Sequence, residues 1–395
     1  MRSLNCTNCE DTMYPRNMQQ TMMTVAKGFP IITITGPRQS GKTTLAKMQF
    51  PDHHYLDLEN PELRMILEHD PRALFPDKDG SYIIDEFQYA PEILSYVKMM
   101  ADANPGSARF ILTGSNQFSM MKHLSQSLAG RTAIFQLLPF SYQEIYQNQK
   151  SEITDVLFKG FYPRLIDQEM DPQMFYTSYI STYLERDVRL LTQVQDRDLF
   201  FRFLGLCAGR TGSLLNKSAL ANEAGVDSKT VNNWLSILQT SYIIHLLQPW
   251  HKNQNKRLVR SPKLYFLDTG LACRLLRIRD AEDLVNHPLK GQIFETFVIT
   301  EYLKMFYNRG SEAPIYFYRE NSGLEIDLLI QRGADLMPVE IKSANVFNLS
   351  QLHNIKLLGK SMSFRSALLV YGGDMSFRLE DTNICPYYQI PSPLN

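Results

Sequence analysis

Short apolar runs alternate with helical patterns over the first third of the chain. The runs cover residues 31–35, 54–58, 82–84, 110–113 and 133–138 and contain many β-branched and aromatic residues. Apolar strands that alternate with helices are typical of a parallel sheet, because each parallel connection needs a long crossover. Residues 14–150 are therefore predicted to form an α/β domain.

From about residue 151 the apolar positions recur at helical spacing, as in segments 176–191 and 198–207. Residues 215–238 predict a helix, a turn at Gly225 and a second helix for which Ser228 is a suitable N-cap. Strand-like segments at 242–249 and 263–267 follow. Residues 151–287 are therefore predicted to be a helical region that contains a winged helix-turn-helix.

A third pattern begins near residue 288 with a helix over residues 291–304. Strands are predicted at 315–319, 324–330, 336–342 and 367–371, with a turn at Gly333 and a helix over 348–358. The resulting order, α-β-β-β-α-β, predicts a second α/β domain at residues 288–395.

Length and composition agree with a multi-domain protein. A chain of 395 residues is too long for one core and fits two or three domains. The 41 Lys and Arg residues balance the 41 Asp and Glu residues, so contact with nucleic acid must come from local basic patches. No apolar run approaches the roughly 18–20 residues that span a bilayer, and no secretory signal is apparent. We expect a cytoplasmic protein without a membrane partner.

Cysteine use changes this picture little. The chain has 5 cysteines, of which Cys6 and Cys9 are close together in a C-x-x-C arrangement. Without a second pair this is a weak signal for zinc binding or redox chemistry. We interpret residues 1–13 as a disordered leader in a reducing compartment.

The apolar run 31–35 leads directly into a complete G-x-x-x-x-G-K-[ST] loop. Such a loop directs backbone N–H groups toward phosphate oxygens at the start of a helix. Lys42 is expected to reach the β- and γ-phosphates, Thr43 to face Mg²⁺ and Thr44 to meet the α-phosphate. The predicted nucleotide-binding residues are Gly36, Pro37, Arg38, Gln39, Ser40, Gly41, Lys42, Thr43, Thr44, Asp85, Ser115 and Asn116.

Two adjacent carboxylates end the predicted strand at residues 82–84. Asp85 is expected to hold Mg²⁺ through its water shell, and Glu86 to orient and deprotonate the attacking water. Thr113, Ser115 and Asn116 end the next strand, where a sensor of the γ-phosphate would lie.

Arg131 follows these residues and has two interpretations. It is either a catalytic arginine finger that acts in a neighbouring subunit, which implies a homo-oligomer, or an exposed arginine in a surface salt bridge.

The helix-turn-helix has a DNA-binding interpretation and a packing interpretation. In the first, Lys229, Thr230, Asn232 and Asn233 face a major groove, while a basic wing contacts phosphates through Lys252, Lys256, Arg257 and Arg260. In the second, the same fold serves packing or protein contact, because the recognition helix carries a single basic residue.

In the last region, Glu340 and Lys342 are two residues apart on a strand and so point to one face. Together with Asp327 they predict a site for a hard divalent cation, with Lys342 as a catalytic cation that polarises water or stabilises a phosphorane. Glu295, from the helix before the strands, is a candidate additional metal ligand.

The chain resembles, from Tyr14 to near its end, a bacterial and archaeal family of ATPases. That family joins an AAA-type P-loop domain, of the archaeal-ATPase-like kind, to a C-terminal domain of unknown function. The resemblance rests on the phosphate loop and six further motifs: Asp85-Glu86, Leu112-Thr-Gly-Ser115, Leu128-Ala-Gly-Arg131, Tyr183-Leu-Glu-Arg-Asp187, Lys263-Leu-Tyr-Phe-Leu-Asp-Thr-Gly-Leu271 and Gly291-Gln-Ile-Phe-Glu295. The leader with Cys6 and Cys9 departs from the family pattern.

The C-terminal part is similar to the PD-(D/E)XK, restriction-endonuclease-like fold, in which Asp327, Glu340 and Lys342 match the metal and lysine positions. The resemblance implies an ATP- and Mg²⁺-dependent ATPase coupled through a winged helix to a Mg²⁺-dependent nuclease-like domain acting on nucleic acid, with DNA favoured. The alternative is a nucleotide-gated DNA-binding or interaction protein whose nuclease-like fold does not cleave.

Overall fold

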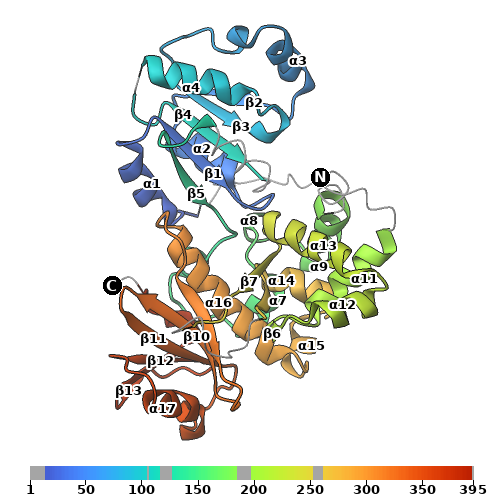
Figure 1. Cartoon of the computed structure of the whole chain (residues 1–395), viewed down its shortest axis with the longest axis vertical. Helices are drawn as coiled ribbons and strands as arrows, with labels where there is room; N and C mark the ends of the chain where they lie inside the picture. The colour runs from blue at the N-terminus through green and yellow to red at the C-terminus, as the bar shows by residue number, and fades with distance from the viewer. Residues whose placement is uncertain (1–13, 105, 116–126, 185–196, 252–260, 394–395) are drawn as a thin grey trace, which may run out of the picture.

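The computed structural model describes residues 14–104, 106–115, 127–184, 197–251 and 261–393 of the chain. An α/β region forms one end of the molecule, a helical region lies beside its base, and a second α/β region forms the other end (Figure 1). The predicted leader with Cys6 and Cys9 falls outside the described residues. No helix in the described part of the chain is both long and apolar enough to cross a bilayer.

The first region is a five-stranded sheet in the order β2-β3-β4-β1-β5, and all of its neighbouring strands run parallel. Its strands are β1 (Ile31–Thr35), β2 (His54–Asp57), β3 (Tyr82–Asp85), β4 (Phe110–Gly114) and β5 (Thr132–Gln136). This arrangement confirms the parallel α/β prediction.

Helices cover both faces of this sheet. Ile32 and Ile34 pack against α1 (Met18–Ala26) and α2 (Lys42–Gln49) on one face. Ile31 and Leu112 share a cluster with residues of α3 (Pro61–His69) and α4 (Ile93–Ala103) on the other. Two 3-10 helices (Pro71–Leu74, Phe87–Tyr89) and α6 (Tyr142–Tyr146) complete the region. Because all strands are parallel, the residues after β1, β3 and β4 meet at one edge of the sheet.

The middle region packs its helices around a three-stranded antiparallel sheet in the order β6-β8-β7. The strands are β6 (Ser213–Leu214), β7 (Ile244–Leu247) and β8 (Lys263–Phe266). The helices are α7 (Ile153–Lys159), α8 (Pro163–Asp167), α9 (Pro172–Tyr179), a π-helix (Ile180–Leu184), α11 (Arg197–Ala208), α12 (Lys217–Ala224), α13 (Ser228–Thr240), α14 (Thr269–Leu275) and α15 (Ala281–Val285).

Two details of this region differ from the prediction. The N-cap of α13 is Asp227, whose carboxylate accepts a hydrogen bond from Thr230 N at 2.6 Å, and Ser228 is the first helical residue. A carboxylate at this position also interacts favourably with the helix dipole. The α-helix predicted from residue 176 ends at Tyr179 and continues as the π-helix.

The last region starts with the long helix α16 (Lys290–Tyr307) and contains a six-stranded sheet in the order β13-β14-β12-β11-β10-β9. The strands are β9 (Ile315–Arg319), β10 (Glu325–Arg332), β11 (Asp335–Lys342), β12 (Ala367–Tyr371), β13 (Phe377–Leu379) and β14 (Thr382–Pro386). Two 3-10 helices (Leu349–Leu352, Tyr387–Gln389) and α17 (His353–Gly359) accompany them. The sequence prediction missed β13 and β14, where charged and polar residues interrupt the apolar pattern.

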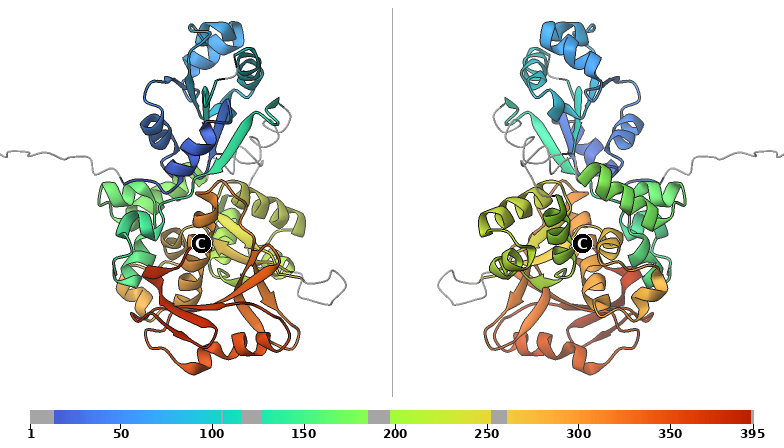
Figure 2. Two further views of the ribbon diagram at one scale, coloured as in Figure 1. Left: turned by 90° about the vertical axis from the view of Figure 1, so that its left-hand side faces the viewer. Right: turned by 90° about the vertical axis from the view of Figure 1, so that its right-hand side faces the viewer.

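Helix α16 belongs to a core that joins all three regions. One hydrophobic cluster contains Leu138, Ile153, Tyr265, Phe297 and Leu328, and the middle region also bonds to the edge strand β9 through a parallel bridge at Pro249. Figure 2 shows the middle helices packed beside α16 and the last sheet. The last sheet is therefore built onto the middle region.

Candidate functional site

The loop between β1 and α2 requires glycine at both of its glycine positions. Gly36 has φ +152°, and a Cβ there would lie 2.1 Å from the carbonyl oxygen of Leu137. Gly41 has φ +90° and is the residue before the first helical position of α2. A side chain at either position would therefore strain the turn that directs the loop onto the helix N-terminus.

Lys42 lies across the mouth of this loop. Its buried side chain places Nζ 3.1 Å from Gly36 O and 2.8 Å from Pro37 O, to which it donates. Arg38 extends away from the loop and donates to the hydroxyl of Tyr89 at 3.1 Å. The ammonium is thus held where the loop N–H groups would receive a phosphate.

Asp85, at the carboxyl end of β3, accepts hydrogen bonds from three hydroxyls. Thr43 Oγ1 lies 2.9 Å from Asp85 Oδ2, Tyr55 OH lies 2.7 Å from the same oxygen, and Thr113 Oγ1 also donates to this carboxylate. Burial, together with the contact to Asp85, raises the pKa of Tyr55. The adjacent Thr43 hydroxyl and Asp85 carboxylate are the oxygen donors that suit Mg²⁺, so the residues present fit this ion.

Glu86 has a left-handed backbone, with φ 52° and ψ 45°. Its carboxylate accepts a hydrogen bond from Ser115 Oγ at 3.1 Å and one from the amide of Gln88. Such a conformation is costly for a residue other than glycine, and similar strain recurs at functional sites. The predicted residues Asp85, Glu86 and Ser115 therefore lie together at the edge that carries the phosphate loop.

The remaining residues of the predicted nucleotide site make none of these contacts or lie outside the described part of the chain. Thr44 is exposed on the first turn of α2, and Gln39 has a positive φ of 61°. Asn116 lies outside the described residues. Sequence reasoning missed Tyr55 and Gln88, because no local motif links β2 or the short helix after β3 to the phosphate loop.

Arg131 lies at the opposite edge of the sheet from the phosphate loop. Arg131 precedes Thr132, which pairs with Ile31 at the start of β1. Gly36 follows the other end of β1, so about six residues of extended chain, or roughly 20 Å along the strand direction, separate Arg131 from Gly36. Its guanidinium forms an ion pair with Asp102, with Nε 2.5 Å from Oδ1 and Nη2 3.0 Å from Oδ2. The geometry matches the predicted surface salt bridge and removes any role at the nucleotide site of the same subunit.

A second polar site forms where β10 and β11 lie side by side. Lys342 Nζ lies 3.0 Å from Asp327 Oδ2 and 2.6 Å from Glu340 Oε2, so the three predicted residues are in contact. Burial raises the pKa of Glu340. Burial also acts to raise the pKa of Asp327, but the charges of Lys342 and Lys263 outweigh it and lower that pKa.

Glu295 does not complete a three-carboxylate metal site with Asp327 and Glu340. It accepts hydrogen bonds from Tyr265 OH at 2.5 Å and from Lys263 Nζ at 3.1 Å, and Lys263 also pairs with Glu325 at 2.6 Å. Among the described residues there is no group of three or more His, Cys, Asp or Glu placed to hold a metal ion. The carboxylate of Glu295 is thus paired with a lysine and a tyrosine of β8, and its role as an additional metal ligand stays a prediction.

Lys263 is a residue of this site that sequence reasoning missed. Its side chain is 4% exposed, although it comes from the middle region rather than from the last sheet. The sequence did contain a signal, since this lysine is the first residue of the apolar strand Lys-Leu-Tyr-Phe. A lysine in a buried strand needs a carboxylate partner, which would have indicated an ion pair here.

The helix-turn-helix residues are exposed on α13. Lys229, Asn232 and Asn233 face solvent and Thr230 is half-buried, while Val231 and Trp234 pack into the core of the middle region. Asn232 accepts a hydrogen bond from Lys217 Nζ at 2.7 Å. The predicted wing residues Lys252, Lys256, Arg257 and Arg260 lie outside the described residues.

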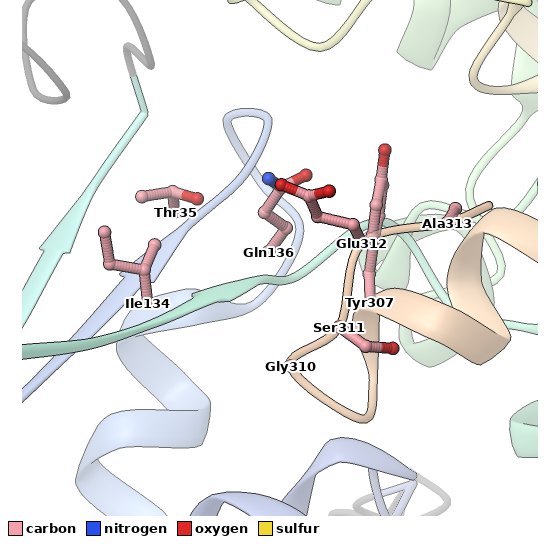
Figure 3. A pocket seen from close by; sticks show the side chains of 8 residues that line it. All are labelled: Thr35, Ile134, Gln136, Tyr307, Gly310, Ser311, Glu312 and Ala313. Atoms are coloured by element: carbon pink, nitrogen blue, oxygen red, sulfur yellow. The ribbon is translucent and has the colours of Figure 1, made fainter. Parts of the chain in front are cut away.

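A cavity of about 370 Å³ separates the first sheet from the turn after α16. Thr35, Ile134 and Gln136 line one side, and Tyr307 and residues 310–313 line the other (Figure 3). Tyr242 OH donates to Thr35 Oγ1 at 2.7 Å, one residue before the phosphate loop. Both the middle and the last regions thus reach the strand that carries this loop.

Residues 28–146 match a sequence family described as AAA domain. The chain carries an AAA-type P-loop ATPase domain. Residues 150–282 match a domain of unknown function, DUF8612, and residues 290–390 match another, DUF4143. The ATPase domain thus agrees with the resemblance seen in the sequence, and so does the presence of a C-terminal domain of unknown function.

Known relatives and solved structures add little about activity. Uncharacterized proteins of Mycobacterium bovis and Mycobacterium tuberculosis are each 29% identical over 357 residues, which cover 89% of this chain and 79% of the relative. A Walker-type ATPase of Pyrococcus abyssi is 14% identical with a TM-score of 0.47, covering 68% of this chain and 97% of that one. The RuvB protein of Thermotoga maritima is 17% identical with a TM-score of 0.29, covering 58% and 87%. TM-scores below 0.5 do not establish a shared fold for the whole chain.

Proposed function

We propose that this protein hydrolyses ATP with Mg²⁺ and uses the nucleotide cycle to control a DNA-processing region formed by the rest of the chain. The observation that carries the ATPase proposal is the contact of Thr43 with Asp85, beside a Glu86 carboxylate held by Ser115. Hydroxyl, carboxylate and general base are the groups that P-loop hydrolysis requires at this edge of the sheet.

In this proposal the loop N–H groups and Lys42 bind the β- and γ-phosphates. Glu86, fixed by Ser115 and Gln88, orients the attacking water and accepts its proton. Mg²⁺ held by Thr43 and Asp85 would neutralise charge on the phosphate oxygens. The hydroxyl of Thr113 holds the Asp85 carboxylate in place.

An arginine finger from a neighbouring subunit remains part of the proposal, and it requires a homo-oligomer. Arg131→Ala is expected to lower ATP turnover on the order of a hundredfold without weakening ATP binding. The reason is that the guanidinium would stabilise the negative charge of the transferring phosphate only in the transition state. Mixing this variant with Glu86→Gln protein should restore part of the turnover through hybrid interfaces, measured as phosphate release.

Asp102→Asn is the matched control for Arg131. This substitution breaks the ion pair between Asp102 and Arg131 but keeps the guanidinium of Arg131. ATP turnover should therefore stay at the wild-type level or above. Normal ATP turnover in Arg131→Ala would rule out the arginine finger and leave the surface salt bridge as the role of Arg131.

We further propose that the middle region binds DNA as a winged helix. Support comes from the packing of α12 against α11 and α13, the antiparallel pair β7 and β8, and the exposed polar positions of α13. The basic segment between β7 and β8 would lie against phosphates as the wing.

Replacing Lys252, Lys256, Arg257 and Arg260 with alanine is expected to weaken DNA binding for all sequences. The log–log salt slope should flatten by about one per lost phosphate contact, measured by fluorescence anisotropy of labelled duplexes across a salt series. A control that loses the same charge elsewhere replaces Lys27, Lys78, Lys98 and Lys150. If affinity and slope are unchanged by the wing replacements, the segment has a packing role.

The C-terminal site supports a Mg²⁺-dependent nuclease-like activity within this proposal. Asp327 and Glu340 would hold one divalent cation, and Lys342 would supply a positive charge to the scissile phosphate. The assignment is supported by the contacts of Asp327, on β10, and Glu340, on β11, with the same ammonium group of Lys342.

A nucleotide-gated binding protein with an inactive nuclease-like fold is the second candidate. One observation favours it: lysines already balance the carboxylates of this site. Lys342 pairs with Asp327 and Glu340, and Lys263 pairs with Glu295 and Glu325. In that case the site would act as an ionic contact between the middle and last regions.

A further inference from the structure

A buried arginine lies behind the phosphate loop. Arg16, just before α1, is 8% exposed, and its Nη1 donates to Ser40 O at 2.9 Å. Its Nη2 donates to Leu138 O at 2.6 Å, and its Nε donates to Glu144 at 3.2 Å. The guanidinium therefore joins the middle of the phosphate loop to the segment that follows β5.

The partner carboxylate is itself held rigidly. Glu144 accepts a hydrogen bond from the backbone N–H of Ser141 at 2.7 Å, as part of the capping box of α6, and another from the backbone N–H of Asn17 at 2.6 Å. The guanidinium also lies 4.6 Å above the ring of Phe140. Arg16 is thus held in one orientation by groups outside the phosphate loop.

The contact with Ser40 determines the orientation of one peptide group. Ser40 C=O and Gly41 N–H belong to the same trans peptide, so they point in opposite directions. Because Ser40 C=O faces Arg16 behind the loop, Gly41 N–H faces the opposite side, toward the loop interior. This N–H is one of the donors that a phosphate loop presents to its anion.

We propose that Arg16 is a positioning residue for nucleotide binding, which fixes the Ser40–Gly41 peptide so that Gly41 N–H faces the phosphates. The inference rests on the ATP-binding function proposed above. Glycine at position 41 leaves the peptide free to rotate, so the loop needs an external donor to hold it. Arg16 supplies that donor through its bond to Ser40 O.

The test compares Arg16→Met and Arg16→Lys in the full chain, titrated with ATP and with ADP in the presence of Mg²⁺. We expect Arg16→Met to raise both dissociation constants by about 10- to 100-fold, the range of a hydrogen bond to a charged group. Arg16→Lys should fall between Arg16→Met and wild type, because one ammonium cannot satisfy all three acceptors.

A matched control separates positioning from general stability. Arg109 is a second buried arginine of the ATPase domain, and it donates to backbone carbonyls of Gly80, Met100 and Asn104 at the opposite edge of the sheet. Arg109→Met should lower the thermal midpoint at least as much as Arg16→Met, while leaving the affinity for ATP and ADP at the wild-type value.

Three results would be decisive. Wild-type affinity in Arg16→Met, with ATP binding by the wild-type protein intact, would overturn the role of Arg16 alone. Equal losses of affinity in Arg16→Met and Arg109→Met would also overturn it, because the effect would then be general destabilisation. If the wild-type protein bound neither nucleotide, the proposed function itself would fail.

Discussion

Glu86→Gln is expected to bind ATP with Mg²⁺ like the wild-type protein and to hydrolyse it about 10³-fold more slowly, a loss typical of removing a general base. The amide preserves the shape of the side chain and its contact with Ser115, but it cannot accept a proton from water. Equilibrium titration with ATP and single-turnover phosphate release would measure the two quantities separately.

Two further variants serve as comparisons for Glu86→Gln. Lys42→Ala should lose ATP binding itself, because the ammonium at the loop mouth is removed. Glu59→Gln alters another carboxylate near the loop, one that contacts Arg38 and Tyr89, and should leave turnover unchanged. Hydrolysis by Glu86→Gln at the wild-type rate would show that another group is the base.

Asp327→Ala, Glu340→Ala and Lys342→Ala are each expected to abolish metal-dependent cleavage of nucleic acid while ATP hydrolysis persists. Asp327 and Glu340 would together hold the cation, and the charge of Lys342 has no substitute in a short neutral side chain. Cleavage of duplex, single-stranded and structured substrates would be measured with Mg²⁺ or Mn²⁺, with and without ATP.

This experiment requires the full chain. Lys263 and Tyr265 come from β8, so a fragment that begins at residue 288 would leave Glu295 and Glu325 without these partners. Asp335→Ala is the matched control, because Asp335 lies at the far end of β11 and pairs with Arg365 on the surface. Absence of cleavage on every substrate, with no Mn²⁺ bound between Asp327 and Glu340, would favour the binding protein with an inactive nuclease-like fold.

Much of the fold was predictable because its signals are local. The strands at 315–319 and 367–371 agree with the prediction to the residue, since each contains a short run of aliphatic and aromatic residues. Strands β13 and β14 carry no such run, and β14 is held by its pairing with β12, a contact distant in sequence. The N-cap at Asp227 was missed by one residue, because Asp and Ser are both good caps.

The sequence by itself determined the phosphate loop and the residues that meet at its edge. A complete loop motif after an apolar strand specifies the local backbone, and parallel strands bring Asp85, Glu86 and Ser115 to one edge. The sequence also singled out Asp327, Glu340 and Lys342, since alternation along a strand sets which side chains share a face.

Only the tertiary structure decided which partners the buried charges take. Arg16 reaches Ser40 and Glu144, and Lys263 reaches Glu295 and Glu325, across segments far apart in the chain. A buried charge must be paired, but nothing local indicates which distant carboxylate or carbonyl will pair with it. The packing of three regions around α16 made that choice, and it pairs the predicted ligand Glu295 with Lys263 and Tyr265.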